Sequence, residues 1–117
     1  MTHWSSFPAH IPDAAPEEAA DVAARLNEVS NPTRLKAMCH LWRRDVDGGE
    51  ATVGHLQEVT GSSQSALSQH LARLRAAGLV ATRRQGQNIY YRLADDDARD
   101  LMDALCGNLC GTRKRDA

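Results

Sequence analysis

The chain has 117 residues, a length that suits one compact domain and is too short for two ordinary ones. Its composition, 42% hydrophobic and 25% charged, supplies enough apolar side chains for a core and excludes a disordered chain. The apolar stretches are far shorter than the roughly 20 residues that cross a bilayer, which excludes a membrane protein. No export signal is recognisable at the N-terminus, so a cytoplasmic location is expected.

The formal net charge of −1 conceals an uneven distribution of charge. Residues 59–94 contain five arginines and no acidic residue, whereas the residues on both sides carry a net negative charge. Chance clustering is one interpretation, but a basic block is also expected where one face approaches a polyanion while the rest stays soluble. The near-neutral total therefore does not exclude a nucleic-acid partner.

Three segments are expected along the chain: a flexible arm over residues 1–15, a folded domain over 16–112 and a basic tail over 113–117. The domain begins with a helix over residues 16–28, because a proline and two glutamates suit a first helical turn. The apolar face of this helix consists of Ala19, Val22, Ala23 and Leu26.

A second helix is expected from Pro32, with Asn31 as its cap, and a loop over residues 45–50. Two further helices are expected over residues 52–59 and 64–77, separated by the turn-forming residues 60–63. The later helix has a buried stripe of Leu67, Leu71 and Leu74, and Gly78 ends it in the left-handed conformation.

The chain then changes character. Strand-like runs over residues 79–84 and 88–93 surround Gln85-Gly86-Gln87 and predict a β-hairpin. Asp95, Asp96 and Asp97 begin a last helix, whose apolar positions are Ala98, Leu101, Met102, Leu105 and Leu109. Four helices, a hairpin and a helix make a mainly α fold with a β-hairpin, in the order of a winged helix-turn-helix domain.

In such a domain the helix over residues 64–77 enters the major groove and the hairpin lies against the DNA backbone or minor groove. Short hydrogen-bonding side chains and one arginine lie opposite the leucine stripe, and two more arginines precede the hairpin tip. Glutamine and arginine pair with base edges, and helix N-terminal amides and arginines bind phosphate. The residues expected to bind DNA are Gln64, Ser65, Ser68, Gln69, Arg73, Arg83 and Arg84.

The run SQSALSQHLARLRAAGLV over residues 63–80, followed by RRQGQNIYY over 83–91, resembles the core of the ArsR/SmtB family of bacterial repressors. The run NPTRL over residues 31–35 is similar to that family's entry to its second helix. The resemblance spans about residues 18–110. It implies a homodimer, joined through the first and last helices, that binds double-stranded operator DNA with an inverted repeat and releases it after an inducer event.

Many family members sense metals, but two common ligand sets are missing from this sequence. A site on the last helix needs histidines there, and no His follows His70. A thiolate site on the third helix needs a cysteine near residues 50–58, which contain none. No metal site of these types and no cofactor is therefore expected, and the remaining candidates are Cys39, Cys106 and Cys110.

The cysteines allow several interpretations. Free cysteine is among the most buried residue types, so all three can be structural. The chain is also similar to the BigR/SqrR-like persulfide- and redox-sensing branch of the family, which implies that Cys39 senses a small reactive sulfur species or oxidant. The resemblance favours Cys110 as its partner, through a disulfide or polysulfide link, while Cys106 lies one turn earlier and remains open as a second candidate.

Two other functions are compatible with the sequence besides a thiol-switched repressor. One is a repressor in which Cys39, Cys106 and Cys110 bind As(III) or another soft metal ion. The other is a constitutive winged-helix DNA-binding or interaction protein with structural cysteines. An enzyme is not expected, because the sequence shows neither a nucleophile-base set nor a phosphate-cradling glycine loop.

Overall fold

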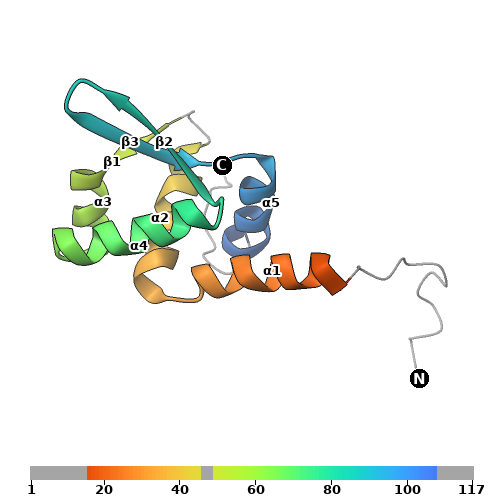
Figure 1. Ribbon diagram of the computed structural model, residues 1–117. Helices are drawn as coiled ribbons and strands as arrows, with labels where there is room; N and C mark the ends of the chain where they lie inside the picture. Colours follow the sequence, from red (N-terminus) through yellow and green to blue (C-terminus); the bar gives the residue numbers. More distant parts are fainter. Residues whose placement is uncertain (1–15, 46–48, 108–117) are drawn as a thin grey trace.

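A computed structural model describes residues 16–45 and 49–107. The elements in chain order are α1 (Pro16–Val29), α2 (Pro32–Asp45), β1 (Ala51–Thr52), α3 (Val53–Thr60), α4 (Gln64–Ala76), β2 (Val80–Gln85), β3 (Asn88–Leu93) and α5 (Asp96–Leu105). The mainly helical fold with a β-hairpin is confirmed (Figure 1). The expected arm and basic tail lie outside the described residues.

Side-chain caps begin four of the helices, α2 to α5. The Asn31 carboxamide accepts a hydrogen bond from the Arg34 amide at 3.0 Å, so the cap expected for α2 is confirmed. Ser63 and Asp95 accept from the amides of Ala66 and Ala98 and begin α4 and α5 in the same way. These polar residues mark in the sequence where each helix begins.

The hairpin belongs to a three-stranded antiparallel sheet of order β1-β3-β2. Strand β1 pairs Ala51 with Tyr91 and Thr52 with Tyr90, and was not predicted, because two residues carry no alternating pattern. Thr52, expected as the first residue of α3, instead caps that helix. Gly86 has φ +64° at the tight turn of the hairpin, where a glycine avoids strain.

The core lies where α2, α3, α4 and α5 meet beneath the sheet. The leucine stripe of α4 is confirmed, since Leu67, Leu71 and Leu74 are fully buried. The other large buried side chains are Met38, Leu41, Trp42, Leu56, Leu79, Leu93 and Met102. Burying one face of α4 presents its opposite face to solvent.

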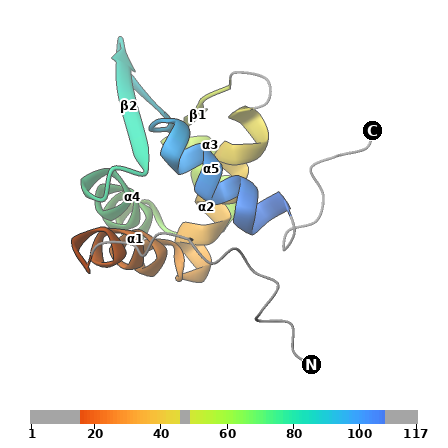
Figure 2. The same cartoon turned by 90° about the vertical axis from the view of Figure 1, so that its right-hand side faces the viewer.

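The arrangement of the elements separates two ends of the molecule. In Figure 2 the hairpin extends away from the helical body, and α1 lies beside α4. Figure 1 shows α3 and the N-terminal end of α4 on the side away from α5. Helix α2 contacts both α4 and α5, so it connects the surface around α4 with the last helix. Among the described helices, none has the length and apolar character that a membrane span requires.

Candidate nucleic-acid interface and cysteine pair

Helix α4 presents short polar side chains at its N-terminal end. Gly61, with φ +73°, ends α3 and turns the chain, and the Ser63 cap then begins α4. Four of the residues expected to bind DNA lie exposed on this helix: Gln64, Ser65, Ser68 and Gln69. The structure brings them together on a surface that can donate hydrogen bonds to phosphates and base edges.

Arg73 lies farther along α4 and has a protein partner. Its Nε and a terminal nitrogen donate to the two carboxylate oxygens of Glu28 at 3.0 and 3.1 Å. Glu28 lies at the end of α1, so this bidentate pair joins α1 to α4. Hydrogen bonding from Arg73 lowers the pKa of Glu28, with Arg34 adding a smaller effect in the same direction. The sequence did not predict this ion pair.

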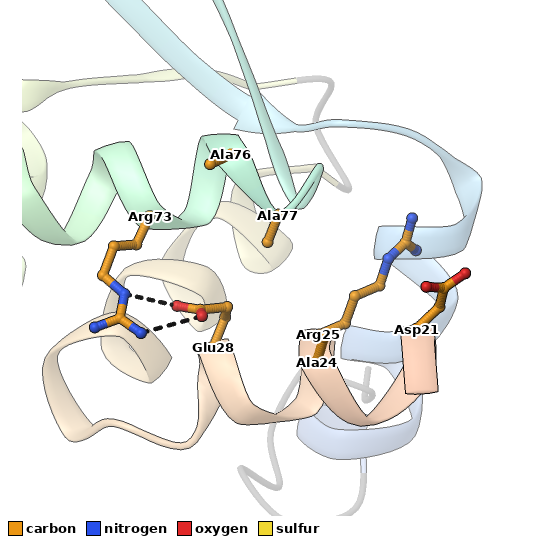
Figure 3. A pocket seen from close by; sticks show the side chains of 7 residues that line it. All are labelled: Asp21, Ala24, Arg25, Glu28, Arg73, Ala76 and Ala77. Carbon is orange, nitrogen blue, oxygen red and sulfur yellow. Dashed lines mark hydrogen bonds and ion pairs between the residues drawn. The ribbon is translucent and has the colours of Figure 1, made fainter. Parts of the chain in front are cut away.

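The pair lies at one end of an open groove between α1 and α4, with a volume of about 610 Å³ (Figure 3). Arg25 and Asp21 lie at the other end of the view, and small alanines separate the two ends. The groove is lined by Asp21, Ala24, Arg25, Glu28, Arg73, Ala76 and Ala77. The groove contains both acidic and basic side chains, which come from the two helices that it separates. These lining residues do not form a convergent catalytic set.

The two arginines before the hairpin tip lie on opposite faces of the sheet, because side chains alternate along β2. Arg83 shares its face with Tyr90, its partner in the register, and its guanidinium stacks on that ring at 4.5 Å. It also binds both carboxylate oxygens of Glu50, at 2.7 to 2.9 Å. Arg84 points to the other face and is exposed, with no hydrogen bond or ion pair to any described residue.

A buried arginine connects α2 with α4. Arg34 is 7% exposed and donates to the backbone oxygen of Glu28, while a second nitrogen of its guanidinium lies 3.0 Å from Nδ1 of His70. The Glu28 carboxylate lies 3.7 Å from the same guanidinium. Glu28 of α1 therefore contacts arginines from both α2 and α4, and these contacts join the three helices at this point.

Cys39 and Cys106 form a disulfide that joins α2 to the end of α5, with a Cα–Cα distance of 6.5 Å. The disulfide uses Cys106, the second candidate that the sequence left open beside the favoured Cys110. Cys106 follows the buried Met102 by one helical turn and therefore lies on the face of α5 that packs on α2. Cys110 itself lies outside the described residues.

Polar contacts reinforce the same junction of α2 with α5. The Trp42 indole N–H donates to the Asp103 carboxylate at 2.6 Å, and Arg99 binds Asp45. Cys39 is 8% exposed and Cys106 fully buried. Cys39 is therefore the more exposed of the two residues.

His40 and His55 were not predicted to meet. Their rings, from α2 and α3, lie 4.7 Å apart between centroids, and Nε2 of His40 is buried with no hydrogen-bond partner among the described residues. Burial is the main cause that lowers the pKa of His40, and the neighbouring His55, Arg44 and Arg43 lower it further. Among the described residues, no group of three or more His, Cys, Asp or Glu side chains is placed to hold a metal ion.

Helix α1 exposes apolar side chains in the single chain. Val22 is 55% and Leu26 40% exposed, and Ala19 and Ala23 are exposed beside them. All four belong to the apolar face expected from the sequence, which the single chain leaves uncovered. An exposed apolar helix face of this kind is typical of an association surface.

Comparison with known proteins gives consistent matches over most of the chain. Residues 31–82 match the model of the bacterial regulatory protein, arsR family. The biofilm growth-associated repressor of Agrobacterium fabrum is 40% identical over 97 residues, which cover 83% of this chain and 79% of that protein. The expected resemblance to the ArsR/SmtB family is thereby confirmed.

Solved structures agree with the fold. HlyU from Vibrio cholerae N16961 superposes with a TM-score of 0.74 at 34% identity, covering 82% of this chain and 99% of that one. The transcriptional repressor BigR from Xylella fastidiosa superposes with a TM-score of 0.68 at 38% identity, covering 82% and 93%. BigR proteins are thus among the relatives, and the winged helix-turn-helix fold is confirmed.

Proposed function

Because the chain belongs to the arsR family of bacterial regulatory proteins, we propose that it is a homodimeric transcriptional repressor whose operator affinity is switched by thiol chemistry at Cys39. The observation that carries this proposal is the pairing of Cys39 with Cys106 across α2 and α5. The inducer is a small reactive sulfur species or oxidant. The names of the Agrobacterium and Xylella relatives support repression, and the exposed apolar face of α1 supports a dimer.

A low-molecular-weight persulfide is the oxidant for the switch and accepts two electrons from the cysteine pair. The Cys39 thiolate, the more exposed of the pair, attacks the outer sulfur of the persulfide, forms a Cys39 persulfide and releases the small thiolate. The Cys106 thiolate then attacks the inner sulfur on Cys39, forms the disulfide and releases hydrosulfide. The persulfide is reduced by two electrons, and the two thiols are oxidised.

The link acts on DNA binding through the position of α2. This helix contacts α4 on one side and α5 on the other, and Arg34 connects it to His70 of α4. Joining α2 to α5 changes how the two recognition helices of a dimer are spaced, which weakens simultaneous binding to both half-sites. A coupling of about 2–3 kcal/mol gives a change of roughly 100-fold in affinity.

The test compares the reduced and persulfide-treated protein on duplex DNA selected from a random library by the reduced form. We expect treatment to weaken binding by roughly 100-fold and a Cys39–Cys106 link to appear in peptide mass spectra. Cys39→Ser and Cys106→Ser should keep their affinity after treatment, whereas Cys110→Ser, the matched control, should respond as the unmodified chain does. Equal release of DNA by all four proteins would overturn the proposal.

The same measurement separates the alternatives. A repressor that senses As(III) or another soft metal ion would release DNA on titration with that ion, and loss of any one of the three thiols would weaken the response. A constitutive DNA-binding protein would respond to neither treatment. A link from Cys39 to Cys110 in place of Cys106 would restore the pairing that the family resemblance favours.

A further inference from the structure

Two acidic side chains from outside the acid-free block bind arginines inside it. Glu28, at the end of α1, binds Arg73 of α4, and Glu50, just before β1, binds Arg83 of β2. In both pairs the carboxylate is the more covered partner: the side chains of Glu28 and Glu50 are 18% and 21% exposed, against 55% and 47% for Arg73 and Arg83. The carboxylates are therefore largely covered by the protein, and each holds the side chain of a more exposed arginine against it.

The geometry of both pairs is bidentate, the arrangement that restricts a guanidinium most strongly. Arg83 is restricted further by stacking on Tyr90 and by donating to the side-chain oxygen of Gln85 at 2.8 Å. A bidentate contact uses two of the five guanidinium hydrogens and turns that edge toward the carboxylate, so the positive charge is already paired before a phosphate approaches. Releasing Arg83 to DNA would require breaking these contacts together.

The neighbouring arginine has the opposite situation. Arg84 is exposed, projects to the other face of the hairpin and has no ion pair with a described residue. The two arginines are adjacent in sequence and carry the same charge, but the sheet alternation separates their surroundings. Arg83, which is ion-paired, and Arg84, which has no ion pair with a described residue, can therefore be compared as matched variants.

We propose that Glu28 and Glu50 limit the DNA affinity of this protein by holding Arg73 and Arg83 away from the phosphates, so that Arg84 is the backbone-contacting cation of the wing. Two of the five arginines in the acid-free block are then withheld from DNA by ion pairs. The inference rests on the proposed DNA-binding function and adds which charges take part. Glu50 has the role of a positioning residue, since it acts through Arg83.

The experiment measures affinity for a short mixed-sequence duplex as a function of salt, using the full-length chain. Each phosphate contact contributes about 0.9 to the slope of log affinity against log salt concentration. We expect Arg84→Ala to reduce the slope by about 0.9 for each protomer, whereas Arg83→Ala should leave it unchanged within about 0.3. An equal reduction by both variants would overturn the proposal.

Removing the acid gives the complementary result. Glu50→Gln should steepen the slope by about 0.9 for each protomer, so a dimer loses roughly tenfold more affinity than the unmodified dimer between about 50 and 200 mM salt. Arg83→Ala added to Glu50→Gln should return the slope to its original value, because no released arginine remains. A steeper slope that persists in the double variant would show general repulsion by Glu50 and would overturn the proposal.

The α4 pair provides an independent arm. Glu28→Gln should steepen the slope through Arg73, and Arg73→Ala should cancel that change. Circular dichroism of each variant checks that helix content is retained. Partial unfolding would lower the affinity, but it would not steepen the dependence of log affinity on log salt concentration. Failure of the unmodified chain to bind any duplex would overturn the DNA-binding function itself, whereas binding with slopes that Glu50→Gln and Glu28→Gln do not change would overturn this inference alone.

Discussion

The exposed side of α4 with the hairpin differs from the α2–α5 junction in what holds its residues in position. Around α4 and the hairpin, ion pairs such as Glu28–Arg73 and Glu50–Arg83 join side chains that are partly exposed. At the junction, a buried disulfide joins α2 to α5, and the buried Trp42 donates a hydrogen bond to the exposed Asp103. Exposed ion pairs contribute little to stability and are screened by salt. The contacts around α4 and the hairpin therefore depend on salt concentration, whereas those of the α2–α5 junction depend on the oxidation state of its cysteines.

The largest expected effect comes from removing packing beneath the exposed face of α4. Leu71 is fully buried, so Leu71→Ala should lower the free energy of unfolding by about 2–5 kcal/mol through lost contacts and a cavity. Gln69, exposed on the same helix, is the matched control, and Gln69→Ala should change stability by less than about 0.5 kcal/mol. Urea unfolding measures both. A small effect for Leu71→Ala would show that α4 is not held by its leucine stripe.

The next effect belongs to the junction. The Cys39–Cys106 disulfide closes a loop with a sequence separation of 67 residues, so its reduction should lower the free energy of unfolding by about 2–4 kcal/mol. Unfolding of oxidised Cys110→Ser, with and without reductant, measures the difference without a competing thiol. Cys106→Ser should be insensitive to reductant in that background. A stability that reductant leaves unchanged would break the contrast between the two regions.

A smaller effect is expected from the hydrogen bond beside the disulfide. The Trp42 indole donates to a carboxylate of Asp103, and charged acceptors make the stronger protein hydrogen bonds. Asp103→Asn keeps an acceptor and should cost less than about 1 kcal/mol, whereas Asp103→Ala removes the charged acceptor of the indole N–H and should cost about 1–3 kcal/mol. Tryptophan fluorescence during unfolding measures both values. Equal costs would show that the indole finds another acceptor.

The smallest effect is a dependence of stability on pH at His40. Because its pKa is lowered in the folded chain, the unfolded chain binds more protons below about pH 6.5, the ordinary histidine value. This contribution to stability is therefore present above that pH and is lost as the pH falls toward the folded value. His40→Gln should flatten the profile of unfolding free energy between about pH 5 and 7. An unchanged profile would assign the dependence to other histidines.

The helices of this fold were predictable because their signals are local. Asn31, Ser63 and Asp95 mark helix beginnings, and the leucine stripe of α4 identifies its buried face within one segment. Strand β1 was not predictable in the same way, since Ala51 and Thr52 become a strand only by pairing with β3. Local propensity therefore located the helices, while the third strand depends on tertiary contact.

The candidate site was predictable as a set of residues but not as a set of partners. The exposed positions of Gln64 and Gln69 follow from helix periodicity. The partners of Arg73 and Arg83 come from 45 and 33 residues away, and no spacing rule connects them. The pairing of Cys39 with Cys106 likewise depends on which turn of α5 faces α2.

The two-residue β1 has a mechanical consequence for the hairpin. Its pairs with Tyr90 and Tyr91 support β3 from its second edge only near the helical body, so the end formed by residues 85–88 is a free two-stranded ribbon. All four of these residues are exposed. The hairpin is thus held by a third strand at its base and has only its own two strands at its tip. Displacement under load grows with distance from this base, so residues 85–88 move more easily than the supported pairs, and Arg84, which lies between the two parts, can adjust its position while the register at the base stays in place.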